Sequence, residues 1–169
     1  SAASDVYKRQ LLADAAATQA LGEELAELWL QHGRAQAAGS QPPILLLRGT
    51  LGAGKTCLVQ GIAAGLGIGE AITSPTFALA QHYQGTAAGS HTALVHLDLY
   101  RLEQPLAADE LFAQEEEEAL ELGALMAVEW SERLSFQPEG AWCVSLTLID
   151  PDQPEAGRRA VLSLNQTCS

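Results

Sequence analysis

The stretch Gly49-Thr50-Leu51-Gly52-Ala53-Gly54-Lys55-Thr56 decides the fold, because it satisfies every fixed position of the phosphate-binding motif G-x-x-x-x-G-K-[ST]. The apolar run 44–47 before it is typical of a buried strand, and the stretch 57–66 after it is typical of a helix. The alternative is a glycine-rich strand-to-helix turn with an ordinary surface lysine. The flanking strand and helix favour a true phosphate-binding loop over that alternative.

The residue types in this stretch suit a nucleoside triphosphate bound with Mg²⁺. Glycine reaches backbone conformations that other residues avoid, so consecutive N–H groups can turn inward around phosphate oxygens. The helix that follows points its positive N-terminal end at the same anion. Lys55 can reach the terminal phosphates, and the Thr56 hydroxyl can ligate Mg²⁺.

Length and composition predict one globular domain. A chain of 169 residues, 47% of them hydrophobic and 18% charged, is long enough for one substantial core and too short for two ordinary ones. Residues 1–10 show neither helical nor strand periodicity. We therefore expect residues 1–10 to be a non-native or disordered leader and residues 11–169 to form the domain.

Charge and cysteine content restrict the partners and the location. The net charge of -12, from 21 acidic and 9 basic residues, disfavours strong direct binding of nucleic acid, so any link to it should pass through a protein partner. The 3 cysteines are odd in number and include no C-x-x-C pair, which argues against a disulfide framework or a zinc site and fits a reducing cytoplasm. No apolar run approaches the ~20 residues that would cross a membrane.

The rest of the chain alternates between helical and extended patterns. Asp14 can cap an amphipathic helix, and a second helix is predicted over 105–122, with Gly123 at its end. Its possible inward positions are Leu106, Leu111, Phe112, Ala119 and Leu122, and the acidic run 115–118 is typical of a solvated face. Strands are predicted over 77–83, 92–100, 124–128, 142–149 and 158–164, with a hairpin loop at 84–90 and a turn at 150–157.

Two acidic residues and one tryptophan are further candidates for the site. Asp98 lies in an apolar strand, where a carboxylate is costly to bury unless it is paired or ligates a cation, although an exposed sheet face would also explain it. Glu129 follows a buried strand, the position from which an acid organises Mg²⁺ beside a phosphate-binding loop. Trp130 either packs in the core or lies near the nucleotide. The hydroxyls of 73–76 either face a nucleotide or metal, or simply lead into a strand.

Four segments together are more specific than any single motif. Leu51-Gly52-Ala53-Gly54-Lys55-Thr56, Ser74-Pro75-Thr76-Phe77, His96-Leu97-Asp98-Leu99-Tyr100-Arg101-Leu102 and Val128-Glu129-Trp130 closely resemble the TsaE (YjeE) family. These are small bacterial P-loop ATPases of tRNA threonylcarbamoyladenosine biosynthesis. The resemblance covers roughly residues 11–134 in order and spacing.

The resemblance implies an α/β P-loop NTPase fold with three layers, in which a mostly parallel central sheet carries antiparallel additions. It implies binding of ATP or ADP with Mg²⁺ and slow ATP hydrolysis in support of the partner proteins TsaD and TsaB. That complex transfers the threonylcarbamoyl group to the adenosine next to the anticodon of tRNA.

The resemblance also assigns roles to individual residues. Lys55, Asp98 and Glu129 match the residues of catalysis, and Thr56, Asp98 and Glu129 match the metal site. Thr76 matches a mobile segment that can sense the terminal phosphate. Arg101 also matches, although it could serve the partner interface instead. The positions expected to contact the nucleotide are Gly49, Leu51, Gly52, Ala53, Gly54, Lys55, Thr56, Cys57, Thr76 and Trp130.

The chain departs from the family pattern in two places, and two other functions stay open. Cys57 stands where threonine is common, and the acidic run 115–118 replaces an apolar-aromatic stretch.

A P-loop kinase of a small metabolite would need a lid segment that carries basic residues. The chain has only 9 Lys and Arg residues in total, which disfavours this function. A nucleotide-gated binding protein without essential hydrolysis is the other alternative.

Overall fold

The computed structural model describes residues 6–35, 41–74 and 79–164, and its seven strands form one sheet. The strands are β1 (Val6–Leu12), β2 (Leu45–Arg48), β3 (Ala80–Ala87), β4 (Ser90–Asp98), β5 (Leu125–Glu129), β6 (Trp142–Leu148) and β7 (Arg158–Ser163). The helices are α1 (Ala15–Ala35), α2 (Lys55–Gly65) and α3 (Pro105–Leu122), with short 3₁₀ turns η2 (Ser131–Arg133) and η3 (Pro154–Ala156).

The centre of the sheet is parallel and its edges are antiparallel. The strand order is β1-β7-β6-β2-β5-β4-β3, and β6, β2, β5 and β4 run parallel to one another. The strands β1, β7 and β3 are added antiparallel. Every residue of β5 is buried, as expected for a central strand covered on both faces. The predicted α/β fold with a mostly parallel sheet and antiparallel additions is confirmed.

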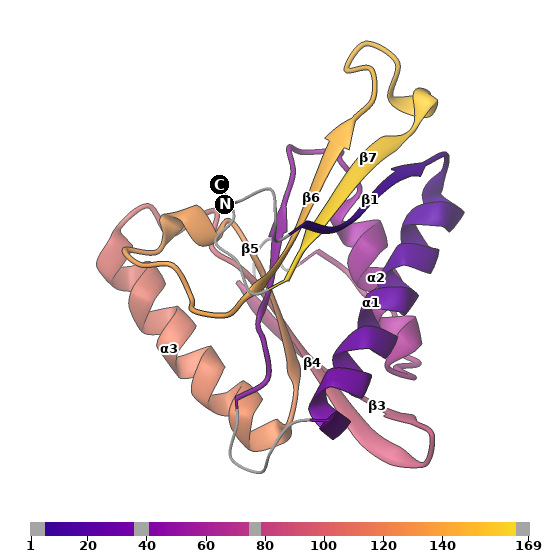
Figure 1. Cartoon of the computed structure of the whole chain (residues 1–169). Helices are drawn as coiled ribbons and strands as arrows, with labels where there is room; N and C mark the ends of the chain where they lie inside the picture. The colour runs from indigo at the N-terminus through magenta and orange to yellow at the C-terminus, as the bar shows by residue number, and fades with distance from the viewer. Residues whose placement is uncertain (1–5, 36–40, 75–78, 165–169) are drawn as a thin grey trace.

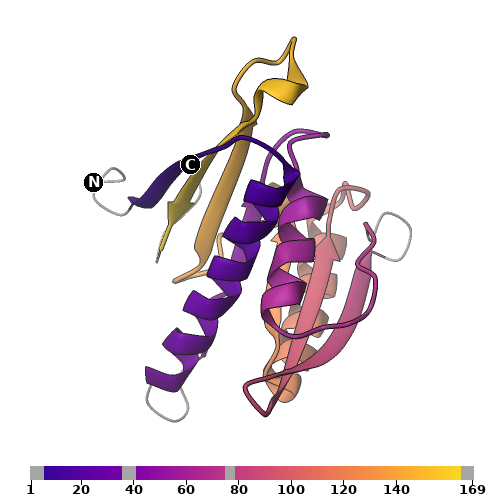
Figure 2. The same cartoon turned by 90° about the vertical axis from the view of Figure 1, so that its right-hand side faces the viewer.

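Helices cover both faces of this sheet (Figures 1 and 2). On one face α1 and α2 lie side by side over a core that includes Leu25, Leu58 and Ile62. On the other face α3 packs through Phe112 and Ala108 against β4 and β5. The three predicted layers therefore surround β2, which delivers the chain to the phosphate-binding motif.

Close helix packing depends on Gly22 and Gly61. A Cβ on Gly61 would clash with the backbone of Gln19, and a Cβ on Gly22 would clash with the backbone of Leu58. The two glycines let the helix backbones touch, which fixes the direction of α2 and of the motif at its start.

Long-range pairing corrects the expectation of disorder for residues 6–10, whereas a non-native origin of residues 1–10 stays a prediction. Val6–Leu12 forms strand β1, which pairs antiparallel with β7, so residues 6–10 belong to the fold. The weak alternation of the segment explains the error, since an edge strand exposes most of one face. That residues 11–169 form a single domain stays a prediction.

Two further details of the elements differ from the sequence pattern. The hairpin between β3 and β4 turns at Ala88 and Gly89, both with positive φ, rather than over 84–90, because a two-residue turn of this kind matches the twist of the strands. In α3, which has the predicted bounds and ends at Gly123, Leu106 is 71% exposed rather than inward. Glu115, expected on a solvated face, is buried.

Cysteine chemistry also differs from expectation at one position. Cys57 is a free thiol, whereas Cys143 is disulfide-bonded. The expectation drawn from the number and spacing of the cysteines is therefore wrong for Cys143.

No helix in the described ranges combines the length and the apolarity needed to span a bilayer.

Candidate nucleotide-binding site

The phosphate-binding motif forms the connection between β2 and α2. Gly52 and Gly54 have φ of 83° and 104°, left-handed conformations in which a side chain would be strained. Lys55 is the first residue of α2, and the first turn of this helix carries no acidic residue. Its N–H groups and positive dipole end are therefore available to an anion.

Lys55 reaches the carboxylate of Glu129 across the end of the sheet. Their side chains, 11% and 7% exposed, place Nζ 3.4 Å from Oε1. Glu129 ends β5 and is the register partner of Leu47 in β2, the strand that leads into the motif. The carboxyl ends of two adjacent parallel strands thus bring the lysine and the acid together, as the sequence predicts for an acid at that position.

His96 holds the second oxygen of the same carboxylate. Its Nε2 lies 2.7 Å from Glu129 Oε2, and the imidazole is completely buried. Burial alone would raise the pKa of Glu129. The hydrogen bond and charge of His96, together with the charge of Lys55, lower it by more, so the pKa of Glu129 lies below its ordinary value. The sequence motif that contains His96 assigns no role to this residue; the signal for one is its place two residues before Asp98, on the same face of an apolar strand.

Asp98 ends β4 directly beside Glu129. The two are register partners of parallel strands, and Asp98 Oδ1 accepts a hydrogen bond of 3.0 Å from the Tyr100 N–H. Burial raises the pKa of Asp98, and the neighbouring Glu129 adds to the rise, while the Tyr100 N–H and Lys55 oppose it. An ionised Asp98 is therefore costly here unless a cation offsets its charge.

The donor set of the site suits Mg²⁺. Thr56, Asp98 and Glu129 offer a hydroxyl and two carboxylates, and Mg²⁺ prefers hard oxygen ligands. The two acids lie side by side, and Thr56 follows Lys55 in the first turn of α2. The adjacent acids, Glu129 buried and Asp98 half-buried, give the ion a physical reason to bind.

Trp130 forms the wall opposite Lys55. Its backbone has a φ of 61°, an uncommon conformation for a large residue, and its ring centroid lies 5.6 Å from Lys55 Nζ. The ring also contacts Tyr100, with centroids 4.8 Å apart, and the guanidinium of Arg133, at 5.4 Å. Trp130 packs against the core on the α3 side and borders the cavity, so both interpretations of its role have structural support.

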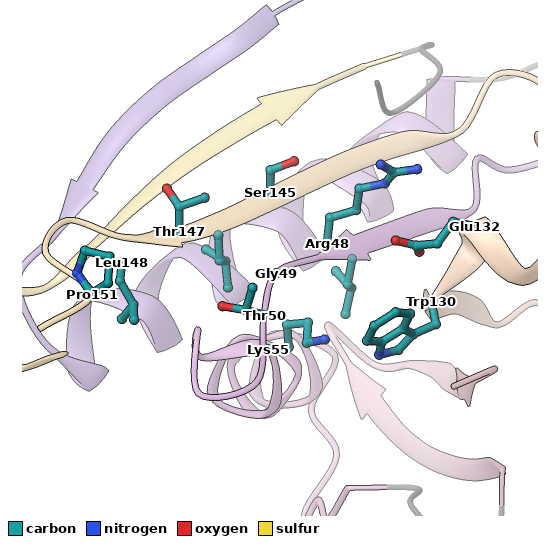
Figure 3. Close-up of a pocket in the computed structure, with 12 residues that line it drawn as sticks. Arg48, Gly49, Thr50, Lys55, Trp130, Glu132, Ser145, Thr147, Leu148 and Pro151 are labelled. Carbon is teal, nitrogen blue, oxygen red and sulfur yellow. The ribbon is translucent and has the colours of Figure 1, made fainter. Parts of the chain in front are cut away.

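A cavity of about 580 Å³ opens between the motif, Trp130 and β6 (Figure 3). Lys55 points across it toward the Trp130 ring, and Ser145 and Thr147 of β6 form its far side. Cavities of this size suit small ligands such as nucleotides. Its lining residues are Leu47, Arg48, Gly49, Thr50, Lys55, Trp130, Glu132, Ser145, Leu146, Thr147, Leu148 and Pro151.

The structure gathers most of the predicted site residues at one end of the sheet. Lys55, Asp98, Glu129 and Trp130 are linked by the contacts above. Within the motif, Ala53 is buried, whereas Leu51 is 99% exposed and therefore free to meet a ligand or a partner. Gly49, Gly52, Gly54, Thr56 and Cys57 lie in or directly after the loop. Thr76 lies outside the described residues.

One histidine-carboxylate cluster lies away from this site. His82 of β3 meets Glu115 and Glu118 of α3, with ligand atoms within 4.8 Å of one another. His82 Nε2 is already 2.6 Å from Glu115 Oε2, so the cluster forms a hydrogen-bonded contact between β3 and α3. Glu115 shares the buried face of α3 with Ala108, Phe112 and Ala119, whereas Glu117 and Glu118 are exposed.

A family model and individual relatives with the same name match this chain. The model of the family "Threonylcarbamoyl adenosine biosynthesis protein TsaE" matches residues 12–159. The chain is similar to the tRNA threonylcarbamoyladenosine biosynthesis protein TsaE of Nostoc sp., with 41% identity over 135 residues, which cover 79% of this chain and 78% of the relative. It is also similar to the protein of that name from Treponema pallidum, with 38% identity over 118 residues, covering 69% and 79% of the two chains.

A solved structure extends the similarity to the fold. The crystal structure of Bacillus subtilis YdiB matches with a TM-score of 0.58 and 26% identity, covering 95% of this chain and 88% of that one. The chain therefore belongs to the TsaE family of threonylcarbamoyl adenosine biosynthesis proteins.

Proposed function

We propose that this protein binds ATP with Mg²⁺ and hydrolyses it slowly, in support of the TsaD and TsaB proteins during threonylcarbamoyl modification of tRNA. One observation carries the ATPase part of the proposal. Lys55 at the start of α2 and the adjacent acids Glu129 and Asp98 meet at the carboxyl ends of parallel strands, beside an open cavity. Phosphoryl transfer depends on such positioning and charge stabilisation.

Each residue has a distinct task in this proposal. The loop from Gly49 to Gly54 cradles the phosphates with its N–H groups, and Lys55 neutralises their terminal charge. Lys55 must leave part of its contact with Glu129, whose Oε1 lies 3.4 Å from the Lys55 Nζ, to do so. His96 keeps Glu129 ionised and oriented during the exchange.

The metal site is proposed from Thr56, Asp98 and Glu129. Bound Mg²⁺ would neutralise the charge that develops on the phosphate oxygens. Asp98 either supports that ion or orients the attacking water, and its position beside Glu129 suits both tasks. Trp130 closes the cavity next to Lys55 and, through its ring, limits access of water to the phosphates.

The partner proteins are proposed from the family and from charge. The related proteins named above belong to tRNA threonylcarbamoyladenosine biosynthesis. The net charge of -12 makes this chain a poor direct ligand for tRNA, so its nucleotide state should act on TsaD and TsaB. A cytoplasmic location follows from that role.

A reconstitution of the modification tests the whole proposal. Purified chain, TsaB, TsaD, threonylcarbamoyl donor and tRNA are combined with ATP, and modified adenosine and free phosphate are measured together. We expect modified tRNA to accumulate over repeated turnovers only when this chain and ATP are present, with phosphate release faster in the complete mixture. The Lys55→Ala variant serves as the control for contaminating ATPase.

Two other results would replace this function. Phosphate transferred from ATP to an added metabolite would identify a small-molecule kinase. Full tRNA modification with a nucleotide analogue that cannot be hydrolysed would identify a nucleotide-gated binding protein.

A further inference from the structure

Arg158 of β7 clamps the phosphate-binding loop from outside the nucleotide site. Its Nε donates a hydrogen bond of 3.1 Å to the Ala53 carbonyl, and its Nη2 donates one of 3.0 Å to the Gly52 carbonyl. The same guanidinium is held from the other side by the carbonyls of Pro154 and Gly157 in the β6–β7 turn. Figure 1 shows this turn projecting from the same end of the sheet as the β2–α2 connection.

The two loop carbonyls need such a donor. When the N–H groups of a phosphate-binding loop turn inward, the carbonyls between them point outward and lose their helical or strand partners. The Gly52 carbonyl shares a peptide group with the Ala53 N–H, and the Ala53 carbonyl shares one with the Gly54 N–H. A cation on these oxygens therefore holds the two peptide planes and polarises the Gly54 N–H, whereas the Ala53 N–H donates a hydrogen bond of 3.0 Å to the Thr50 carbonyl inside the loop.

Among the described residues, Arg158 forms no ion pair within 4.0 Å. It lies close to the N-terminal end of α2, where a cation opposes the helix dipole. The Arg158 charge also acts on Cys57. Burial raises the pKa of the Cys57 thiol, and the positive charge of Arg158 partly opposes that rise. A phosphate in the loop would offset this charge.

We propose that Arg158 is a positioning residue for nucleotide binding, which holds the loop backbone through the Gly52 and Ala53 carbonyls and adds long-range attraction for the phosphates. The inference rests on the proposed function, because it names how this chain prepares the same site. Arg158 touches neither the cavity nor the acids at Glu129 and Asp98, so it acts through the loop. It therefore affects nucleotide affinity more than turnover.

Arg159 offers a matched control for the test. It is the next residue of the same strand, carries the same charge and is exposed. Affinity for a fluorescent ATP analogue is measured for the wild type, Arg158→Gln, Arg158→Lys and Arg159→Gln, together with phosphate release at saturating ATP. Arg158→Gln should weaken affinity about tenfold and change the saturated rate less than about threefold. The affinity of Arg158→Lys should lie between those of the wild type and Arg158→Gln, since an ammonium keeps the charge but cannot donate to both carbonyls with the planar geometry of a guanidinium.

A second readout does not depend on nucleotide binding. Amide hydrogen exchange in the nucleotide-free protein should speed up at residues 52–55 in Arg158→Gln and stay unchanged in Arg159→Gln. If even the wild type fails to bind the analogue, the proposed function fails, and the exchange result alone decides whether Arg158 positions the loop. Equal affinity and equal loop exchange in Arg158→Gln and Arg159→Gln would overturn the inference. If Arg158→Gln does not fold, Arg158→Lys against Arg159→Gln decides it by the same two measurements.

Discussion

His96 Nε2 lies 2.7 Å from Glu129 Oε2, and both side chains are buried at the end of adjacent parallel strands. The carboxylate is thus held from one side by an imidazole and from the other by Lys55. Variants of these residues can therefore test two properties separately. One is the binding of the phosphates, and the other is the charge that acts on them during hydrolysis.

Removal of Lys55 should abolish nucleotide binding. In Lys55→Ala the phosphates lose their nearest cation, while the Glu129 carboxylate loses a partner and repels them. We expect the affinity for ATP, measured by calorimetry, to fall about a hundredfold or more. Lys8→Ala is the control, because Lys8 forms a surface ion pair with Glu24. Binding retained in Lys55→Ala would show that the loop does not hold the phosphates.

Neutralising the two acids should remove turnover and spare binding. Asp98→Asn and Glu129→Gln keep the shape of the side chains but lose the charge that orients the metal or the water. Phosphate release at saturating ATP should fall about a hundredfold, whereas the affinity for ATP stays similar or increases because a negative charge is gone. Wild-type turnover in Asp98→Asn would show that the role assigned to Asp98 is wrong.

His96 should act on turnover through Glu129. In His96→Phe the carboxylate loses the hydrogen bond that orients it, and we expect turnover to fall about tenfold to a hundredfold. His96→Gln keeps a donor and should recover part of the rate. His91→Gln on the same strand is the control, because His91 is exposed. A purely structural role would lower thermal stability in His96→Phe without changing the rate of the folded protein.

The His82–Glu115 pair should stabilise the contact between β3 and α3. Glu115 is buried and its Oε2 lies 2.6 Å from His82 Nε2, so His82→Ala leaves a buried carboxylate without this partner. The free energy of unfolding in urea should decrease by about 1–3 kcal/mol. The exposed neighbour provides the comparison: Glu117→Gln should change stability by less than about 0.5 kcal/mol. A double variant His82→Ala/Glu115→Gln should cost less than the two single changes added together.

The pH dependence of stability should include a contribution from Asp109. Its carboxylate accepts hydrogen bonds from the Ser135 hydroxyl and N–H, and these lower the pKa of Asp109 below its ordinary value in the folded protein. Because the pKa of Asp109 is lower in the folded than in the unfolded protein, its ionised carboxylate stabilises the fold at pH values above the unfolded-state pKa. This contribution is lost as the pH falls through the folded-state pKa. The wild type should be more stable than Asp109→Asn at neutral pH, and the difference should close in strong acid. A difference that does not change with pH would contradict this origin.

Local sequence patterns predicted the parts of this protein that depend on neighbouring residues. The octapeptide at Gly49 lies between a strand and a helix because glycines, a buried apolar run and a helical period are all readable within about 25 residues. Helix α3 has the predicted bounds because Pro105 begins it and Gly123, with φ 63°, ends it. Asp98 was a candidate because it is a lone carboxylate within the apolar stretch 92–100, and Glu129 was a candidate because it follows the apolar stretch 124–128.

Tertiary structure decided the contacts that join distant segments. Residues 6–10 show a strand only when they pair with β7, and the hydrogen-bond partner of Glu115 comes from the distant strand β3 as His82. His96 and Glu129 are 33 residues apart, and Arg158 and Ala53 are 105 apart. Hydrogen bonds of this kind depend on strand order and register, which periodicity does not specify. The sequence alone therefore determined the phosphate-binding motif and its fold, and only the folded chain decided which side chains orient Glu129 and which one holds the loop.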